Sequence, residues 1–219
     1  MIIDLNLQNK VVVVIGGGRE AEKRISALVG QKCKIIVLAK ETTKLVNDLA
    51  RIRKIQLKKI KIRDSAFITK YKPDIVITTT DDSKINQQII AAAKKKKILA
   101  YSSDNPESSD FSNPAIINFE NAVQIAIFTG GKSPAMSKKI KSKVQKALKK
   151  IITKEEIGQI KIQKIVRENA KKTIATQNER RRALLKIMAD KTIKQLINDG
   201  NLKRAEKRAM SMLRDENGQ

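Results

Sequence analysis

Three consecutive glycines near the N-terminus are the first residues whose types and spacing could do chemistry. The pattern GxGxxA is met by the run Gly16-Gly17-Gly18-Arg19-Glu20-Ala21, which follows an apolar stretch. In such a run, Gly16 permits a tight turn, Gly18 lets the backbone approach a pyrophosphate, and Ala21 allows close helix–sheet packing. The run therefore predicts a dinucleotide site. The alternative is a glycine turn in a Rossmann domain that has lost its ligand.

The end of the next apolar run bears on the choice of cofactor. An acidic residue that binds the ribose is expected there, but the run ends at Leu38-Ala39-Lys40, and Glu41 follows. Glu41 could reach a ribose, whereas Lys40 could favour a 2′-phosphate. The spacing leaves NAD and NADP both open.

A third polar group follows the fourth apolar run. It reads Thr78-Thr79-Thr80-Asp81-Asp82, with Asn86 four residues further on. Ligands of open α/β sheets bind at the carboxyl ends of the strands, so Thr79, Thr80 and Asp81 are candidates for cofactor contact. Either aspartate could equally be the N-cap of the following helix.

Acid–base chemistry has few candidates because the chain contains no histidine. Carboxylates, lysine, tyrosine or the cofactor must then do this work. Asp104 follows a predicted strand and is a reasonable general base, although its position also suits a turn.

A second pocket is predicted at Thr129 and the turn Gly130-Gly131-Lys132-Ser133, where glycines, a lysine, a hydroxyl and a helix N-terminus suit a carboxylate or phosphate. A purely structural turn is the alternative.

The elements that must position these residues alternate between strand and helix. Apolar runs predict strands at 10–15, 33–39, 55–60, 74–78 and 98–101, and helical periodicity predicts helices at 19–30, 41–53 and 82–97. This alternation is typical of βαβ units. The sequence predicts a Rossmann-like, doubly wound parallel sheet over residues 1–113.

The pattern changes after residue 113. Two strands, 115–119 and 122–129, would form a hairpin about Glu120-Asn121, and a helix would begin at Ser133 and Pro134 and run to about Ile152. These elements define a second region, 114–152. Residues 153–219 are expected to form an all-helical, basic subdomain with breaks near Gly158 and Asp199-Gly200.

The net charge of +25 in 219 residues is the strongest compositional feature. It suits contact with nucleic acid, steering of a polyanionic small molecule, or a proteome rich in lysine. Residues 132–219 carry a net +16 and the preceding residues +9, so the excess is densest toward the C-terminus. Aromatic residues make up only 3%, which argues against stacking on nucleic-acid bases.

Targeting and metal-binding signals are scarce. The single cysteine excludes an internal disulfide and a CxxC knuckle, and we expect no protein-held metal. The N-terminus does not resemble a signal peptide. No stretch approaches the roughly 20 apolar residues of a membrane helix. We expect a cytoplasmic protein.

Four motifs occur together, in one order. They read GGGxxAxxR from Gly16, TTDDxxxN from Thr79, DxPxxxDFxxPA from Asp104 and TGGKSP from Thr129. In this combination the chain resembles the precorrin-2 dehydrogenase module of the sirohaem synthase family, over residues 1–150 and more weakly through the tail. The departures are Ser102-Ser103, where an Asn-Val-Val-like run is common, and Ser109, where cysteine is frequent.

The resemblance implies a function. It implies an NAD-dependent enzyme that oxidises precorrin-2, an octacarboxylate tetrapyrrole, to sirohydrochlorin, and that in some members also inserts Fe²⁺. It further implies an intertwined homodimer in which 114–152 is the dimerisation region. Asp104 matches the family's essential aspartate, and Thr129 matches an active-site serine of some members. The cofactor-contacting region corresponds to Gly16, Gly18, Thr79, Thr80 and Asp81.

Two other classes of function remain open from the sequence. A regulatory nucleotide-sensing module would keep the glycine run and would not need Asp104. A nucleic-acid-binding protein would use the basic helices and would show salt-dependent binding without tetrapyrrole turnover.

Overall fold

The computed structural model describes residues 2–215. The chain forms two compact units, Met1–Asn113 and Pro114–Gln219. None of the helices within residues 2–215 is both long and apolar enough to cross a lipid bilayer.

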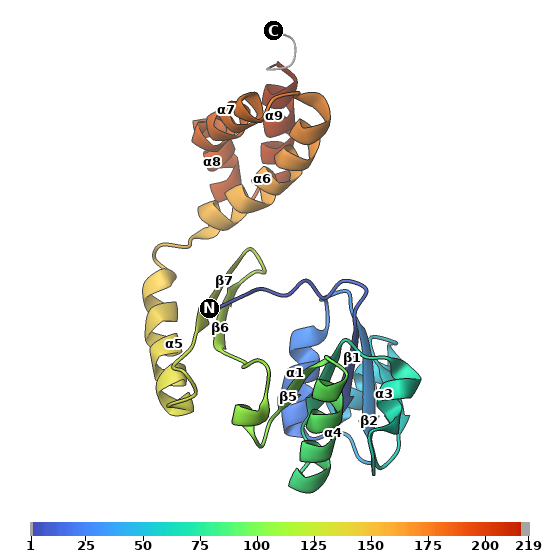
Figure 1. Ribbon diagram of the computed structural model, residues 1–219. Helices are drawn as coiled ribbons and strands as arrows, with labels where there is room; N and C mark the ends of the chain where they lie inside the picture. The colour runs from blue at the N-terminus through green and yellow to red at the C-terminus, as the bar shows by residue number, and fades with distance from the viewer. Residues whose placement is uncertain (1, 216–219) are drawn as a thin grey trace. The chain divides into compact units, whose positions relative to one another are not determined.

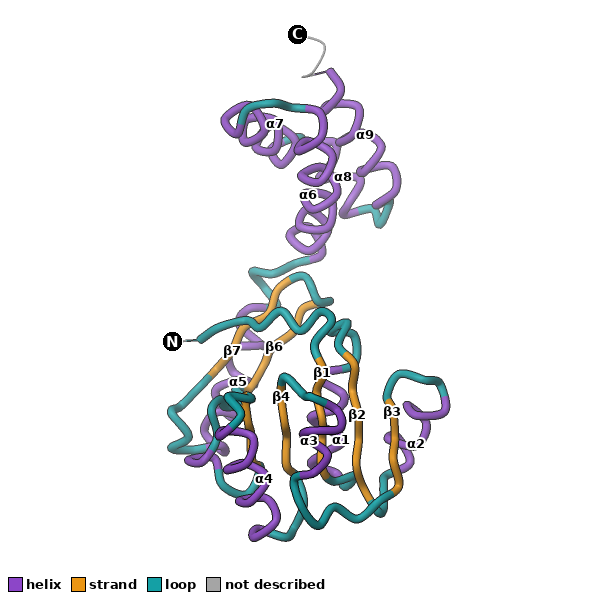
Figure 2. The backbone as a smooth tube through the Cα atoms, turned by 45° about the vertical axis from the view of Figure 1, so that its right-hand side comes forward, coloured by secondary structure: helices purple, strands orange, loops and turns teal. Residues whose placement is uncertain are grey.

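The first unit is a five-stranded parallel sheet with helices on both faces (Figure 1, Figure 2). In chain order its elements are β1 (Val11–Ile15), α1 (Arg19–Leu28), β2 (Lys34–Ala39), α2 (Lys44–Arg51), β3 (Gln56–Lys59), α3 (Ala66–Tyr71), β4 (Ile75–Thr78), α4 (Ser83–Lys95), β5 (Leu99–Ser102) and the 3₁₀ turn η1 (Pro106–Ser108). The strand order is β3-β2-β1-β4-β5, and all four pairings are parallel. The predicted doubly wound sheet is confirmed, and its order reverses direction between β1 and β4.

The central strand, β1, is a continuous Val/Ile run because both of its faces are buried. Val12 and Val14 pack with α1 and α2 on one face, while Val13 and Ile15 pack with α3 and α4 on the other. A parallel strand that is covered on both sides needs apolar residues at every position.

The helix predicted at 41–53 begins later, so this boundary was wrong. The Thr43 side chain caps α2 by accepting a hydrogen bond from the Val46 N–H, and the helix starts at Lys44. The Thr43 N–H donates to the Gly17 carbonyl at 2.9 Å. Residues 41–43 are therefore a loop held against the glycine turn. The short helix α3 was not predicted.

The second unit begins with a hairpin and a helix, β6 (Ala115–Phe119), β7 (Val123–Ile127) and α5 (Pro134–Leu148). The strands pair antiparallel. Glu120 and Asn121 lie at the centre of a turn in which the Ala122 N–H donates to the Phe119 carbonyl at 2.9 Å, and their φ of 50° and 56° are the positive values that tight hairpin turns favour. Ser133 caps α5 by accepting from the Met136 N–H at 3.2 Å, and Pro134 is its first residue. The predicted hairpin and helix start are confirmed.

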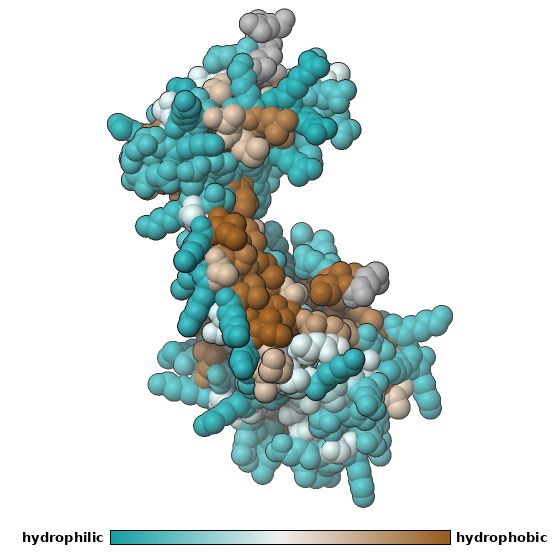
Figure 3. Space-filling view, turned by 90° about the vertical axis from the view of Figure 1, so that its left-hand side faces the viewer, coloured by the Kyte–Doolittle hydropathy of each residue, from teal (hydrophilic) through white to brown (hydrophobic). Residues whose placement is uncertain are grey.

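The hairpin and α5 leave much apolar surface exposed. Figure 3 shows a patch of hydrophobic side chains on this part of the chain. Among the residues of β6, α5 and the segments that flank them, the exposed large apolar side chains are Ile116, Phe128, Met136 and Ile151. No residue of α5 is fully buried.

The rest of the second unit is helical, with α6 (Lys154–Thr173), α7 (Gln177–Ala189), α8 (Lys191–Asn198) and α9 (Leu202–Asp215) around one apolar core. The break expected at Gly158 was wrong, because α6 runs through that position. A Cβ atom there would overlap the side chain of Ile197 in α8 and would lie 3.3 Å from Leu202 Cδ2. Glycine allows α6 and α8 to approach closely. Asp199 and Gly200 do separate α8 from α9.

This contact generates a stability prediction. Gly158→Ala adds about 1 kcal/mol of helix propensity, but an overpacked core costs about 1–3 kcal/mol. We expect a lower Tm by calorimetry. In the Ile197→Ala background the same substitution should no longer destabilise, since the overlapping atoms are gone. Additive effects of the two substitutions would contradict the close-contact explanation.

Candidate functional site

A cleft of about 730 Å³ opens at the carboxyl ends of the strands of the first unit. Its lining residues come from the carboxyl ends of β1 and β2, from the loops after β1, β2, β3 and β4, and from the starts of α1 and α4: Ile15, Gly16, Gly17, Gly18, Arg19, Glu20, Leu38, Ala39, Lys40, Glu41, Thr42, Thr43, Ile60, Lys61, Ile62, Thr79, Thr80, Asp81, Asp82 and Ile85. The volume is within the usual range for small-molecule and cofactor sites. The position between β1 and β4 is the point at which the strand order reverses, where ligands of such sheets bind.

The three glycines at the cleft have different roles. Gly16 has φ of +109°, and a Cβ there would overlap the Thr79 hydroxyl. A Cβ on Gly17 would overlap the Glu41 carbonyl. Gly18, by contrast, has no heavy atom within 4 Å of a Cβ and lies on the cleft wall. Gly16 and Gly17 are thus required by the packing of the turn, and Gly18 leaves open space that a ligand could fill.

The N-terminus of α1 is available to an anion. Gly18 is its N-cap and supplies no side-chain hydrogen bond, whereas hydroxyl or carboxylate side chains cap α2, α4, α5, α6, α7 and α8. Free N–H groups and the helix dipole favour negative charge at such an end. Ala21, in the first turns of α1, is fully buried against the sheet and does not line the cleft.

The predicted ribose-contacting pair lies on the cleft rim. Lys40 Nζ is 3.5 Å from Glu41 Oε1, and both side chains are highly exposed, at 74% and 87%. Asp81 is exposed on the same cleft, next to Thr79 and Thr80. Asp82 caps α4 by accepting from the Ile85 N–H at 3.1 Å.

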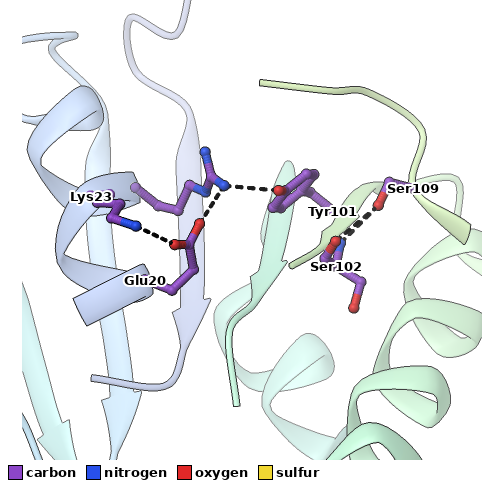
Figure 4. A network of polar contacts seen from close by, with 6 residues as sticks. Glu20, Lys23, Tyr101, Ser102 and Ser109 are labelled. Carbon is purple, nitrogen blue, oxygen red and sulfur yellow. Dashed lines mark hydrogen bonds and ion pairs between the residues drawn. The ribbon is translucent and has the colours of Figure 1, made fainter. Parts of the chain in front are cut away.

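Glu20 is engaged with its own helix. It accepts from Lys23 Nζ at 3.0 Å and pairs with Arg24 (Figure 4). Arg24 Nη2 also donates to the Tyr101 hydroxyl at 2.9 Å, which connects α1 to β5. Partial burial raises the pKa of Glu20, but hydrogen bonds and ion pairs with Lys23 and Arg24 outweigh it and lower the pKa below its usual value. Glu20 is thus an ionised structural partner of Arg24 as well as a residue of the cleft.

Asp104 lies in the loop that follows β5 and is not among the cleft-lining residues. Its Oδ1 accepts a hydrogen bond from Ser102 Oγ, and its Oδ2 accepts one from Ser83 Oγ at 2.8 Å. Partial burial raises the pKa of Asp104, but hydrogen bonds from Ser102, Ser83 and Asn86 outweigh this and lower it below the usual aspartate value. The side chain is exposed and ionised at neutral pH.

The loop is held in place by further hydrogen bonds. The Ser102 N–H donates to Ser109 Oγ at 2.9 Å (Figure 4). The Ala100 N–H donates to Asp110 Oδ2 at 2.9 Å, and Asp110 pairs with Lys94 at 3.2 Å. Ser109, which stands where cysteine is frequent in the family that the sequence resembles, thus holds a backbone N–H of this loop.

The residues predicted to form a second pocket, Thr129 to Ser133, lie in the second unit. Gly130 and Gly131 have positive φ, and no atom lies within 4 Å of a Cβ on either. Thr129 Oγ1 is 2.9 Å from Ser137 Oγ and donates to the Ser133 carbonyl at 3.3 Å. Lys132 is exposed, so this turn combines a free ammonium group with hydroxyls that already have partners.

Sequence reasoning missed several residues of these sites. Thr42, Thr43 and residues 60–62 line the cleft, and Ser83 bonds to Asp104. The hydroxyl of Thr43 ahead of a helical run was an available capping signal; nothing local could have indicated Ser83. Within residues 2–215 no three acidic, cysteine or histidine side chains come close enough together to hold a metal ion.

The parallel sheet, its strand order and the glycine turn define a nucleotide-binding domain of the Rossmann type. The chain belongs to the family described as "Putative NAD(P)-binding", whose model matches residues 3–115, just over half of the chain.

Curated relatives extend the similarity beyond this domain. The chain is 26% identical to Siroheme synthase 3 of Aeromonas hydrophila subsp. hydrophila over 96% of its own length and 43% of the relative's. It is 26% identical to Siroheme synthase 2 of Yersinia enterocolitica over 88% of its length and 39% of the relative's. The chain thus spans about two fifths of these proteins.

A solved structure shares the whole fold. The structure named "SirC, precorrin-2 dehydrogenase" superposes with a TM-score of 0.71, covering 96% of this chain and 99% of that one, at 18% identity.

The open space at Gly18 gives a binding prediction. Gly18→Asp would place a carboxylate in the cleft beside the α1 N-terminus, where it would repel a pyrophosphate. We expect calorimetry to show loss of NAD(P) binding while the Tm stays near wild type, because no heavy atom lies within 4 Å of a Cβ at this position. Gly17→Ala is the opposite case and should lower the Tm. Unchanged nucleotide affinity in folded Gly18→Asp would rule out this site.

Proposed function

We propose that the protein is an NAD-dependent precorrin-2 dehydrogenase that produces sirohydrochlorin. The proposal rests chiefly on the glycine turn and the α1 N-terminus, which has no side-chain cap and opens into the cleft where the strand order reverses. An ionised Asp104, hydrogen-bonded to Ser83, lies at the same end of the sheet. The names of the relatives and of the solved structure support the same activity.

The cleft residues fit a nicotinamide dinucleotide. The turn at Gly16–Gly18 and the α1 N-terminus would hold the pyrophosphate, and the open space beside Gly18 is a cradle that a side chain would fill. Glu41 would bind the ribose hydroxyls, with Lys40 beside it. Thr79, Thr80 and Asp81 form the opposite wall. We favour NAD over NADP because Glu41 offers a carboxylate to the ribose hydroxyls and pairs with Lys40, the neighbouring candidate for a 2′-phosphate.

The reaction removes a hydride and a proton from the tetrapyrrole. When bound, the nicotinamide supplies the hydride acceptor. Asp104 takes the proton on a carboxylate oxygen, because this carboxyl group is ionised at neutral pH. Activity that depends on this ionised form is present at neutral pH and is lost as the pH falls through the pKa of Asp104.

The second unit would bind the substrate and a second copy of the chain. Thr129 and the turn through Ser133, with the exposed Lys132, would contact carboxylates of the substrate. A two-stranded hairpin is marginal by itself, and its apolar surface around Phe128 and Met136 is exposed. A homodimer formed through residues 114–152 would cover this surface.

A substitution at Asp104 tests the catalytic role. Asp104→Asn keeps the size and turn-forming capacity of the side chain and removes the base. We expect kcat for precorrin-2 oxidation to fall by at least about 100-fold, with NAD⁺ affinity unchanged by calorimetry. Oxidation at the wild-type rate would reduce Asp104 to a turn residue. Loss of Fe²⁺ insertion alone, with oxidation intact, would move its role to chelation.

The net charge of +25 generates a kinetic prediction. If the positive surface steers an octacarboxylate, kcat/KM should fall steeply between low and physiological salt while kcat changes little. Stopped-flow absorbance of the tetrapyrrole at several ionic strengths measures both. A kcat/KM that is independent of salt would mean that the charge reflects a lysine-rich proteome or serves another partner. Salt-dependent DNA binding without turnover would favour the nucleic-acid class.

A further inference from the structure

Three polar side chains of the described residues are buried, and all three lie around Asp104. Thr78 and Asn86 are 0% exposed, and Ser102 is 1% exposed. A buried polar group costs free energy unless it is hydrogen-bonded. Because these three buried side chains lie close together, we expect them to belong to one hydrogen-bond network.

The first branch of the network runs through two hydroxyl groups. Ser102 Oγ donates to Asp104 Oδ1, and Thr78 Oγ1 lies 2.9 Å from Ser102 Oγ. A hydroxyl carries one hydrogen, and that of Ser102 is used on the carboxylate. Thr78 therefore donates to Ser102, and Ser102 donates to Asp104. A chain of donors that ends on a carboxylate oxygen suits the ionised form of Asp104.

The second branch comes from the start of α4 and reaches the cleft. Ser83 Oγ donates to Asp104 Oδ2 at 2.8 Å. Asn86, one turn further along α4, donates from Nδ2 to the Thr80 carbonyl at 2.8 Å and accepts from Thr80 Oγ1 at 2.7 Å. Thr80 lines the cleft. The first turn of α4 thus fixes both Asp104 and one residue of the cleft wall.

We infer that Ser102 and Ser83, with Thr78 behind Ser102, are positioning residues that hold the Asp104 carboxylate in a fixed orientation at the carboxyl end of the sheet, where the cleft opens. They act through Asp104 and need no contact with the substrate. The inference deepens the proposed function and rests on it for its catalytic consequence.

The charges around Asp104 agree with a network of neutral donors. The hydrogen bonds that lower the pKa of Asp104 come from Ser102, Ser83 and Asn86. The charged side chains at the start of α4 are Asp82 and Lys84, that of η1 is Glu107, and further along Asp110 pairs with Lys94 at the end of α4. No ion pair joins Asp104 to any of these within residues 2–215.

The test measures the pKa of Asp104 directly. In full-length protein with ¹³C-labelled aspartate, the Asp104 carboxyl signal is assigned by its loss in Asp104→Asn and titrated by NMR. We expect Ser102→Ala to raise this pKa toward the ordinary aspartate value, since one donor to the carboxylate is gone. Ser108→Ala is the matched control, because Ser108 Oγ donates to the Asn105 carbonyl in the same loop, and it should leave the pKa unchanged.

A double variant separates positioning from packing. Ser102→Ala leaves the buried Thr78 hydroxyl without its partner, so part of any effect could come from a strained core. Adding Thr78→Val removes that hydroxyl, and we expect the Tm to recover while the pKa of Asp104 stays raised. A wild-type pKa in Ser102→Ala or in the double variant, or an equal rise in Ser108→Ala, would overturn the inference.

Turnover provides the second measurement. We expect kcat of the double variant to fall about 10-fold or more, with KM for NAD⁺ near wild type and the acidic limb of the pH–rate profile moved upward. The NMR titration needs no substrate. If the wild-type protein does not oxidise precorrin-2 but Ser102→Ala still raises the pKa of Asp104, the proposed function is contradicted and the positioning network is supported.

Discussion

The close approach of the ends of β1 and β4 is the constraint on which the rest of the site depends. Gly16 has no side chain, so Thr79 can lie against the turn and donate from its hydroxyl to the Ile15 carbonyl at 2.9 Å. The strand order reverses here, and α1 and α4 cover opposite faces of the sheet. The cleft opens between these two connections, with the unprotected N-terminus of α1 on one wall and Thr79, Thr80 and Asp81 on the other.

The pairing of β4 with β5 positions Asp104, the proposed general base. Parallel pairing sets Thr78 of β4 opposite Ser102 of β5, which brings the two hydroxyls together under Asp104. In the mechanism that we propose, the Asp104 carboxylate takes the role of the more common imidazole base, which a chain without histidine cannot supply. Hydroxyl donors lower the pKa of this carboxylate and fix its orientation.

The sequence predicted the features that depend on local pattern. Apolar periodicity located five parallel strands, and the glycine run and the Thr-Asp cluster after β4 marked where the cleft opens. Tertiary contacts decided the rest. Gly158 resembles a helix break, but it is a contact point between α6 and α8. Ser83 reaches Asp104 only because β4 and β5 are neighbours, and no spacing rule predicts that partner.

Mixing precorrin-2 with the protein and NAD⁺ and recording the absorbance spectrum decides whether the glycine cleft and Asp104 together oxidise a tetrapyrrole. We expect the sirohydrochlorin spectrum to appear, with one NADH formed per tetrapyrrole. Tight binding of NAD⁺ with no change in the tetrapyrrole spectrum would contradict the proposed activity and would favour a nucleotide-sensing module.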